Sequence, residues 1–377
     1  MIGTRPEAVK MAPVIEAVTA RGGCDHRLLL TGQHTDLVDQ VLAHFRIRSD
    51  YDLDLMKPGQ SLFDVGTGCL DGMRGVLEEF RPDVTIVQGD TATVFFAGVA
   101  SFLRRGRLAH VEAGLRSRRK WSPFPEEMLR RMTDTISDFC FAPTPAAADN
   151  LRAEGVEEER IWVTGNTVVD AVESAKSRSM VPDDPTVAEL LASPRRLVLL
   201  TAHRRESFGE PLKRVFSAVA ELSDRFPDLN ILYPVHPNPN VRKPAYRLLG
   251  TPERSGRIHL TGSLSYRDML AVLSGASLVL TDSGGIQEEA PAFNVHTLVL
   301  RDVTERPEGV RAGVATLVGT DSRLILAEAT RRLSDVAAGL PANPYGDGKA
   351  GERIADIILS SLAGRPRRTT DWQPSGT

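Results

Sequence analysis

The sequence lacks the features that mark several large classes of protein. Its three cysteines, Cys24, Cys69 and Cys140, are widely spaced and form no C-x-x-C pair. This spacing argues against a disulfide framework or a zinc ribbon, and it predicts packing residues in a reducing compartment. No run approaches the roughly 20 apolar residues needed to cross a bilayer, and no charged-then-apolar signal pattern opens the chain. We therefore expect a cytoplasmic protein without a membrane partner.

Excess charge is also missing. The formal net charge is −3 and the pI is about 6.3, which gives no electrostatic reason to expect a nucleic-acid partner. The short basic run Arg116, Arg118, Arg119 and Lys120 has no interleaved aromatics, so we interpret it as a solvated or lid face. There is no zinc spacing, Walker loop or nucleophile elbow, and residues 66–72 miss the dinucleotide pattern by one residue. We expect no metal and no cofactor.

Short apolar runs that alternate with helical patterns are abundant. They fall at residues 27–31, 84–88, 107–111, 138–142, 161–164, 197–201, 230–235, 277–281, 297–300 and 314–318. Continuous apolar strands indicate parallel sheets covered on both faces. Because 377 residues exceed one typical domain, we predict two doubly wound, Rossmann-like α/β domains facing across a cleft.

The expected boundaries follow from this pattern. We assign residues 1–165 to an N-terminal domain and 166–350 to a C-terminal domain. Residues 351–364 are predicted to form a helix that packs back on the first domain, and the polar residues 365–377 a mobile tail. Residues 3–6 have the pattern of a loop entering a helix, with almost nothing before them. Either the fold begins on a helix, or a strand preceding Met1 belongs to it.

The run from Leu278 to Thr281 leads into Ser283, Gly284 and Gly285. Two glycines at a helix start let backbone N–H groups approach a phosphate, and the helix dipole adds positive potential. Glu289 follows about one and a half turns later, within reach of sugar hydroxyls. The alternative is an ordinary turn with Ser283 as N-cap.

Polar residues follow four other predicted strands. They are Asp90, Glu112, His203 and His236. Each alone is more often a cap or a satisfied partner than a catalyst, but several at the carboxyl ends of parallel strands indicate an active site. Glu126 and Glu127 follow a proline-stiffened loop, and they could equally be acids favoured by a helix N-terminus.

Several motifs in order carry a resemblance to a known family. They include Gly3-Thr-Arg-Pro-Glu-Ala-Val-Lys10, Gln88-Gly-Asp-Thr91, His110-Val-Glu-Ala-Gly-Leu-Arg116, Pro123-Phe-Pro-Glu-Glu127, Ala202-His-Arg-Arg-Glu-Ser207, Thr281-Asp-Ser-Gly-Gly-Ile-Gln-Glu-Glu-Ala290 and Arg301-Asp-Val-Thr-Glu-Arg-Pro307. Over nearly its whole length the chain resembles the non-hydrolysing bacterial UDP-N-acetylglucosamine 2-epimerases, which have the glycosyltransferase-B fold. The resemblance implies a homodimer that interconverts UDP-GlcNAc and UDP-ManNAc for cell-surface polysaccharide biosynthesis. The implied reaction eliminates UDP to a 2-acetamidoglucal and adds it back, without a nicotinamide cofactor.

The resemblance also implies residue roles. Asp90, Glu112 and Glu126 correspond to the catalytic acids, and a protonated His203 would steady the departing diphosphate. The residues implied to bind UDP or the substrate are Arg5, Lys10, Met269, Ser283, Gly284, Gly285, Glu289 and Arg306. Met269 stands where the family often has a Phe near the uracil, so a sulfur contact would replace ring stacking.

A second, activating UDP-GlcNAc site occurs in many members. The corresponding residues here are Gln33, His34, Arg204 and His236. Gly68 stands where that site has an Arg, and Asp36 replaces a Gln. Because a diphosphate would lose a charged donor and meet a carboxylate, we expect activation to be weakened or lost.

Other readings remain open from the sequence. A hydrolysing epimerase would release ManNAc and UDP, and a relative could act on another UDP-amino sugar. A glycosyltransferase of the same fold or a nucleotide-sugar sensor would have no use for the cluster of Asp90, Glu112 and Glu126.

Overall fold

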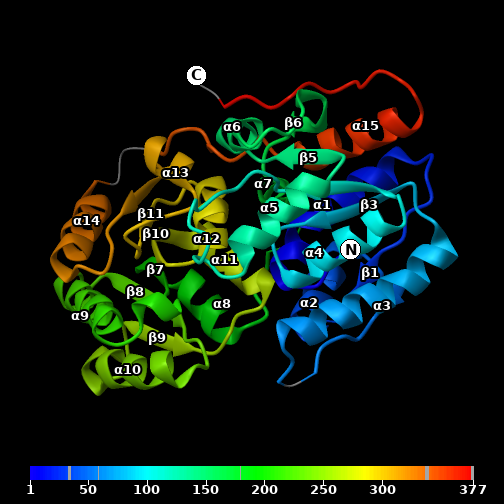
Figure 1. Ribbon diagram of the computed structural model, residues 1–377. Helices are drawn as coiled ribbons and strands as arrows, with labels where there is room; N and C mark the ends of the chain where they lie inside the picture. The colour runs from blue at the N-terminus through cyan, green and yellow to red at the C-terminus, as the bar shows by residue number, and fades with distance from the viewer. Residues whose placement is uncertain (33–34, 58, 179, 336–338, 375–377) are drawn as a thin grey trace. The chain divides into compact units, whose positions relative to one another are not determined.

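The computed structural model describes residues 1–32, 35–57, 59–178, 180–335 and 339–374. The chain divides into two compact units: unit 1 comprises Met1–Ser174 and Tyr345–Thr377, and unit 2 comprises Ala175–Pro344. Each unit is an α/β domain built on parallel strands (Figure 1).

Unit 1 holds a four-stranded sheet in the order β3-β4-β5-β6 and a pair, β1-β2. Its strands are β1 (Leu29–Leu30), β2 (Tyr51–Asp52), β3 (Val84–Gln88), β4 (Arg107–Val111), β5 (Phe139–Ala142) and β6 (Ile161–Val163). Its helices are α1 (Arg5–Arg21), α2 (Thr35–Phe45), α3 (Leu62–Phe80), α4 (Ala92–Leu103), α5 (Glu126–Ile136), α6 (Pro145–Ala153), α7 (Thr167–Lys176), which reaches the unit boundary, and α15 (Ala350–Leu362). Ile2 forms a parallel bridge with Leu30, and the amino group of Met1 donates to the carbonyl oxygen of Ile86 at 2.9 Å. Residues 1–2 therefore lie between β1 and β3.

The six strands of unit 2 form one parallel sheet in the order β12-β11-β10-β7-β8-β9. They are β7 (Arg196–Thr201), β8 (Leu229–Pro234), β9 (Ile258–Thr261), β10 (Ala276–Thr281), β11 (Thr297–Val299) and β12 (Ala315–Leu317). The helices are α8 (Pro185–Ala192), α9 (Glu210–Arg225), α10 (Pro239–Leu249), α11 (Tyr266–Gly275), α12 (Gly284–Glu289), α13 (Pro307–Arg311) and α14 (Ser322–Ser334). This is the doubly wound strand order, and its direction reverses between β7 and β10.

Strand β7 explains why the sequence has continuous apolar runs. Val198 and Leu200 pack in the core under α9, α10 and α14, whereas Leu197 and Leu199 pack on the opposite face with α8 and α11 (Figure 1). Successive side chains of a strand point to opposite faces, so a strand covered on both sides must be apolar throughout. The expected class, two doubly wound parallel α/β domains, is confirmed.

The C-terminal segment belongs to unit 1, where α15 packs against α1 (Figure 1). A Cβ at Gly351 would lie 2.6 Å from the carbonyl oxygen of Pro13, so the close approach of the two helices depends on this glycine. Asp170 on α7 accepts a hydrogen bond from the backbone N–H of Gly351 at 2.7 Å. This contact keeps the first part of α7 in unit 1, and the boundary falls at Ser174 rather than at the expected 165.

Residues 365–374 correct the expectation of a mobile tail. Trp372 is buried in a cluster with Cys140, and its backbone N–H donates to Val163 at 2.8 Å. The carboxylate of Asp356 accepts the backbone N–H groups of Arg368 and Thr369 at 2.6 and 2.7 Å. A buried indole and a buried carboxylate hold the segment in place, and residues 375–377 lie outside the described part of the chain.

The expectation that all three cysteines are packing residues is corrected in one case. Cys69 and Cys140 are buried, and burial raises the pKa of the Cys69 thiol to about 12. Cys24 is exposed.

Candidate active site

In unit 1, two carboxylates follow neighbouring strands. Gln88 on β3 is paired with Val111 on β4, so Asp90 and Glu112 emerge at the same edge of the sheet. Gly89 has φ +86°, a conformation that glycine adopts without penalty. Glu112 has φ +70°, which costs a non-glycine residue on the order of 1 kcal/mol and is typical of functional positions.

Both carboxylate oxygens of Glu112 accept hydrogen bonds. Lys10 Nζ donates to Oε1, and Gln88 Nε2 donates to Oε2. The side chains of Lys10 and Glu112 are each 8% exposed, so an ammonium balances the buried carboxylate. Gln88 was not singled out from the sequence.

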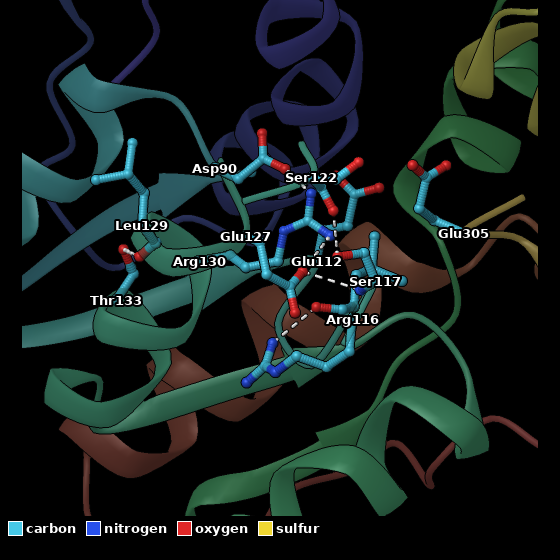
Figure 2. A network of polar contacts seen from close by, with 12 residues as sticks. Asp90, Glu112, Arg116, Ser117, Ser122, Glu127, Leu129, Arg130, Thr133 and Glu305 are labelled. Atoms are coloured by element: carbon cyan, nitrogen blue, oxygen red, sulfur yellow. Dashed lines mark hydrogen bonds and ion pairs between the residues drawn. The ribbon is translucent and has the colours of Figure 1, made fainter. Parts of the chain in front are cut away.

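Asp90 has a different partner, Arg130 on α5, which donates to its Oδ2 (Figure 2). Arg130 is buried, and its Nε and Nη1 hydrogen bond to nothing in the described residues, although Nη1 lies 3.6 Å from Glu127 Oε2. Its place one turn after Glu126 is the only signal by which the sequence could have indicated it.

The two acids that begin α5 differ in burial and in hydrogen bonding. Glu127 is buried and accepts the backbone N–H groups of Ser117 and Arg118 at 2.9 and 3.0 Å, so it holds the preceding loop (Figure 2). Glu126 is half-buried, and its Oε2 is shielded from water without a hydrogen-bond partner among the described residues.

Glu7 on α1 is a further buried carboxylate, one that sequence reasoning did not single out. It accepts the backbone N–H of Gly3 at 2.6 Å and the hydroxyls of Thr4 and Thr91 at 3.0 Å each. Burial raises its pKa to about 7, although these hydrogen bonds act in the opposite direction. Arg5 begins the same helix and is half-buried.

The expectation of a solvated basic face is wrong for Arg116. Its side chain is 2% exposed, and its guanidinium donates to Asp134 at 2.7 Å and to Glu154 at 2.9 and 3.0 Å. Two acids far along the chain neutralise this arginine, which the local composition could not reveal. Arg118, Arg119 and Lys120 are exposed.

In unit 2, the strand order changes direction between β7 and β10, and these two strands end beside each other. His203 follows β7, and Asp282 and Ser283 follow β10. Asp282 Oδ2 accepts the backbone N–H groups of His203 and Arg204 at 2.6 and 2.8 Å. His203 Nδ1 lies 3.3 Å from Asp282 Oδ1, and its ring stacks on His236 with centroids 5.6 Å apart. A doubly wound sheet binds its ligands at such a reversal.

The glycine pair begins helix α12, with Ser283 as the N-cap residue. A Cβ at Gly284 would lie 2.9 Å from Arg306 Cζ, so the absence of a side chain lets the guanidinium approach the helix start. Arg306 Nε donates to Glu288 at 2.9 Å. The buried N-terminus of α12 and this guanidinium together suit a phosphate.

The remaining candidates in unit 2 are placed as follows. Glu289 ends α12 and is 9% exposed, and Met269 on α11 packs beside the core of that face. His236 is exposed, and its Nδ1 accepts the backbone N–H of Asn238 at 3.1 Å. Of the expected second site, Gln33 and His34 lie outside the described residues.

The described residues contain neither a metal-binding cluster nor a membrane-spanning helix. No group of histidine, cysteine and acidic side chains could hold a metal ion. No helix there is long and apolar enough to span a membrane.

Similarity to known proteins identifies the family. The model of the UDP-N-acetylglucosamine 2-epimerase family matches residues 16–359. The chain belongs to this family. The UDP-N-acetylglucosamine 2-epimerase of Yersinia pestis is 44% identical over 367 residues, covering 95% of this chain and 97% of that protein.

Solved structures agree with the family assignment. The UDP-GlcNAc 2-epimerase of Neisseria meningitidis, solved bound to UDP-GlcNAc, has a TM-score of 0.86 and 39% identity, covering 96% of this chain and 98% of that one. A glycosyltransferase of Rickettsia africae shares only 10% identity but has a TM-score of 0.56, covering 97% of this chain and 92% of that one. That likeness concerns the fold alone and is consistent with a glycosyltransferase-B type fold.

Proposed function

We propose that this epimerase interconverts UDP-GlcNAc and UDP-ManNAc by eliminating UDP and adding it back. The C2–H and C1–O bonds break, a C1=C2 double bond forms in a 2-acetamidoglucal, and re-addition returns a proton to the opposite face of C2. No electrons are gained or lost, so the reaction needs no redox cofactor. Family membership and the UDP-GlcNAc bound to the Neisseria meningitidis enzyme support this substrate.

The observation that carries the proposal is the different surroundings of three carboxylates in unit 1. Glu112 has a donor on each oxygen, Asp90 is paired with Arg130, and Glu126 Oε2 has no hydrogen-bond partner in the described chain. Groups with separated environments can perform separate acid and base roles.

We assign the roles from these surroundings. Glu112 stabilises the positive charge that builds on the ring as UDP leaves. Asp90 and Glu126 exchange the C2 proton, one removing it and the other returning it.

We assign UDP to groups of unit 2. The backbone at Ser283, Gly284 and Gly285 and the guanidinium of Arg306 hold the diphosphate, and His203 steadies it as it leaves. Glu289 binds the ribose and Met269 contacts the uracil, and the family resemblance implies that Arg5 and Lys10 supply further positive charge.

We also carry over two expectations from the family resemblance. The protein is proposed to act as a cytoplasmic homodimer, and sedimentation velocity tests the oligomeric state. Arg204 and His236 are proposed to be what remains of an activator site that Gly68 weakens.

Incubation with UDP-GlcNAc in D2O, followed by proton NMR, tests the reaction. We expect UDP-ManNAc to form with deuterium at C2, and deuterium to enter recovered UDP-GlcNAc. Accumulation of free ManNAc together with UDP would select the hydrolysing reaction instead. Absence of deuterium at C2 would refute epimerisation by proton exchange and favour a transferase or a sensor.

A further inference from the structure

His110 is a buried histidine next to the proposed catalytic carboxylates. It lies on β4, two residues before Glu112, and its side chain is 1% exposed. Its Nδ1 is 2.6 Å from Asp134 Oδ1, and its Nε2 is 2.8 Å from the carbonyl oxygen of Gly89.

Both partners of the ring are acceptors. A neutral imidazole has only one N–H, so one of these short contacts would then bring two lone pairs together. Both contacts are hydrogen bonds only when each ring nitrogen carries a proton. The geometry therefore favours a ring that carries a proton on each nitrogen.

The surroundings balance this charge. Asp134 also accepts the Arg116 guanidinium at 2.7 Å and the backbone N–H of Gly114 at 3.2 Å, and Arg116 continues to Glu154 at 2.9 Å. Burial opposes ionisation of Asp134, but His110 and Arg116 outweigh it and lower the pKa of this carboxyl group. The row of His110, Asp134, Arg116 and Glu154 alternates in sign, so no net charge is buried.

The thiol of Cys140 also lies close to Asp134. Cys140 Sγ lies 3.7 Å from the backbone carbonyl oxygen of Asp134. Burial raises the pKa of this thiol, so it adds no charge to the group.

At one end of this row, His110 contacts the backbone carbonyl of Gly89, the residue before Asp90. Gly89 receives a hydrogen bond from His110 at its carbonyl oxygen and donates its own N–H to Val111 at 3.2 Å. The Gly89 carbonyl belongs to the peptide unit that it shares with Asp90. Fixing that peptide plane limits the directions in which the Asp90 side chain can point.

We propose that His110 is a positioning residue, an imidazolium anchored by Asp134 that holds the Gly89–Asp90 peptide in the orientation catalysis requires. The proposal rests on the proposed role of Asp90, but the charge state of the ring can be tested without any substrate.

NMR of protein labelled with ¹⁵N in histidine tests the charge state. We expect one of the eight histidines to show a hydrogen-bonded proton on each ring nitrogen, and its signals to vanish in His110→Gln and persist in His203→Asn. A spectrum of the wild-type protein in which no histidine is doubly protonated would overturn the proposal, even if no variant folds.

Two variants test the positioning role. Glutamine can place its amide N–H near the position of Nε2 and keep a donor for the Gly89 carbonyl oxygen, whereas asparagine can place one only near Nδ1. Because a displacement of about 1 Å can cost about 100-fold in rate, we expect His110→Asn to lower kcat about 100-fold with KM within about threefold. His110→Gln should lower kcat only about tenfold.

The control is another buried histidine. His296 of unit 2, bonded to Thr316 at 2.9 Å, lies outside the proposed site, and His296→Asn should leave kcat within about twofold. Equal losses of kcat in the two His110 variants, or a loss that appears mainly in KM, would overturn the positioning role. A failure of the deuterium experiment would instead refute the proposed reaction and leave the NMR result standing.

Discussion

Replacement of Glu7 by glutamine should make unit 1 more stable at high pH. The Glu7 side chain is 2% exposed, and burial is the main reason that its pKa is raised from 4.5 to about 7. In Glu7→Gln, the amide oxygen can accept the Gly3 N–H, and the NH2 group can donate to the hydroxyls of Thr4 and Thr91, which rotate to accept. The substitution thus removes a buried ionisable group while keeping its shape.

The sign of the effect follows from proton linkage. Between pH 4.5 and 7 the folded state holds a proton at Glu7 that the unfolded state has released, so stability falls as pH rises through this window. The shift is about 2.5 pH units, and at 1.36 kcal/mol per unit it corresponds to about 3 kcal/mol of stability present below pH 4.5 and lost above pH 7. Glu7→Gln should abolish this loss.

Tryptophan fluorescence is a suitable probe because all three tryptophans, Trp121, Trp162 and Trp372, belong to unit 1. The two units of the chain need not unfold in one step. Urea unfolding followed by tryptophan fluorescence at pH 5 and pH 8 therefore measures the free energy of unfolding of unit 1. The free energy of unfolding of the wild type should fall by about 2.5 kcal/mol more than that of Glu7→Gln between the two pH values, because pH 5 lies slightly inside the window.

The matched control is Glu16→Gln, which changes a half-buried glutamate on the same helix. It should reproduce the pH dependence of the wild type. An identical pH dependence in Glu7→Gln and the wild type would refute the assignment of this window to Glu7.

Three further substitutions give separate expectations. In Gly68→Arg the new Cβ would lie 3.4 Å from the side chain of Leu55, an ordinary contact distance. This variant should restore a charged donor to the activator site and create a lag in UDP-ManNAc turnover that trace UDP-GlcNAc removes. The control Gly75→Arg, whose Cβ would lie in open space on the same helix, should show no lag. Trp372→Ala should lower the free energy of unfolding of unit 1 by about 3–5 kcal/mol in urea, because it empties a buried indole site; a loss below about 1 kcal/mol would support a mobile tail. Gly284→Ala should displace the guanidinium above it and raise KM for UDP-GlcNAc about tenfold in steady-state assays, whereas Gly285→Ala, whose Cβ would meet no atom closer than 4.0 Å, should raise it less.

The sequence was most informative about strands that helices cover on both faces of a sheet. All ten predicted runs overlap strands of the structure, and most of these strands are buried on both faces, which leaves a continuous apolar run. Two strands were missed. Tyr51–Asp52 is only two residues long, and Ile258–Thr261 is an edge strand in which three of four residues are only half-buried.

The sequence indicated the carboxylates but not their partners. Glu112 is held by Lys10, 102 positions away, and Asp90 by Arg130, 40 positions away. The buried Arg116 was misassigned for the same reason, since Asp134 and Glu154 reach it through the fold. Strand ends follow from local pattern, whereas ion pairs between distant residues depend on how the elements pack.

Contacts between distant residues also give the three acids of unit 1 different surroundings. Glu112 has a donor on each carboxylate oxygen, whereas Glu126 Oε2 is shielded from water and has no donor among the described residues. The residues that surround these acids, Lys10, Gln88 and Arg130, lie on α1, β3 and α5, so the assembled unit rather than any one motif determines the hydrogen bonds of each carboxyl group. Substituting these neighbours should therefore lower kcat while every proposed acid remains in place.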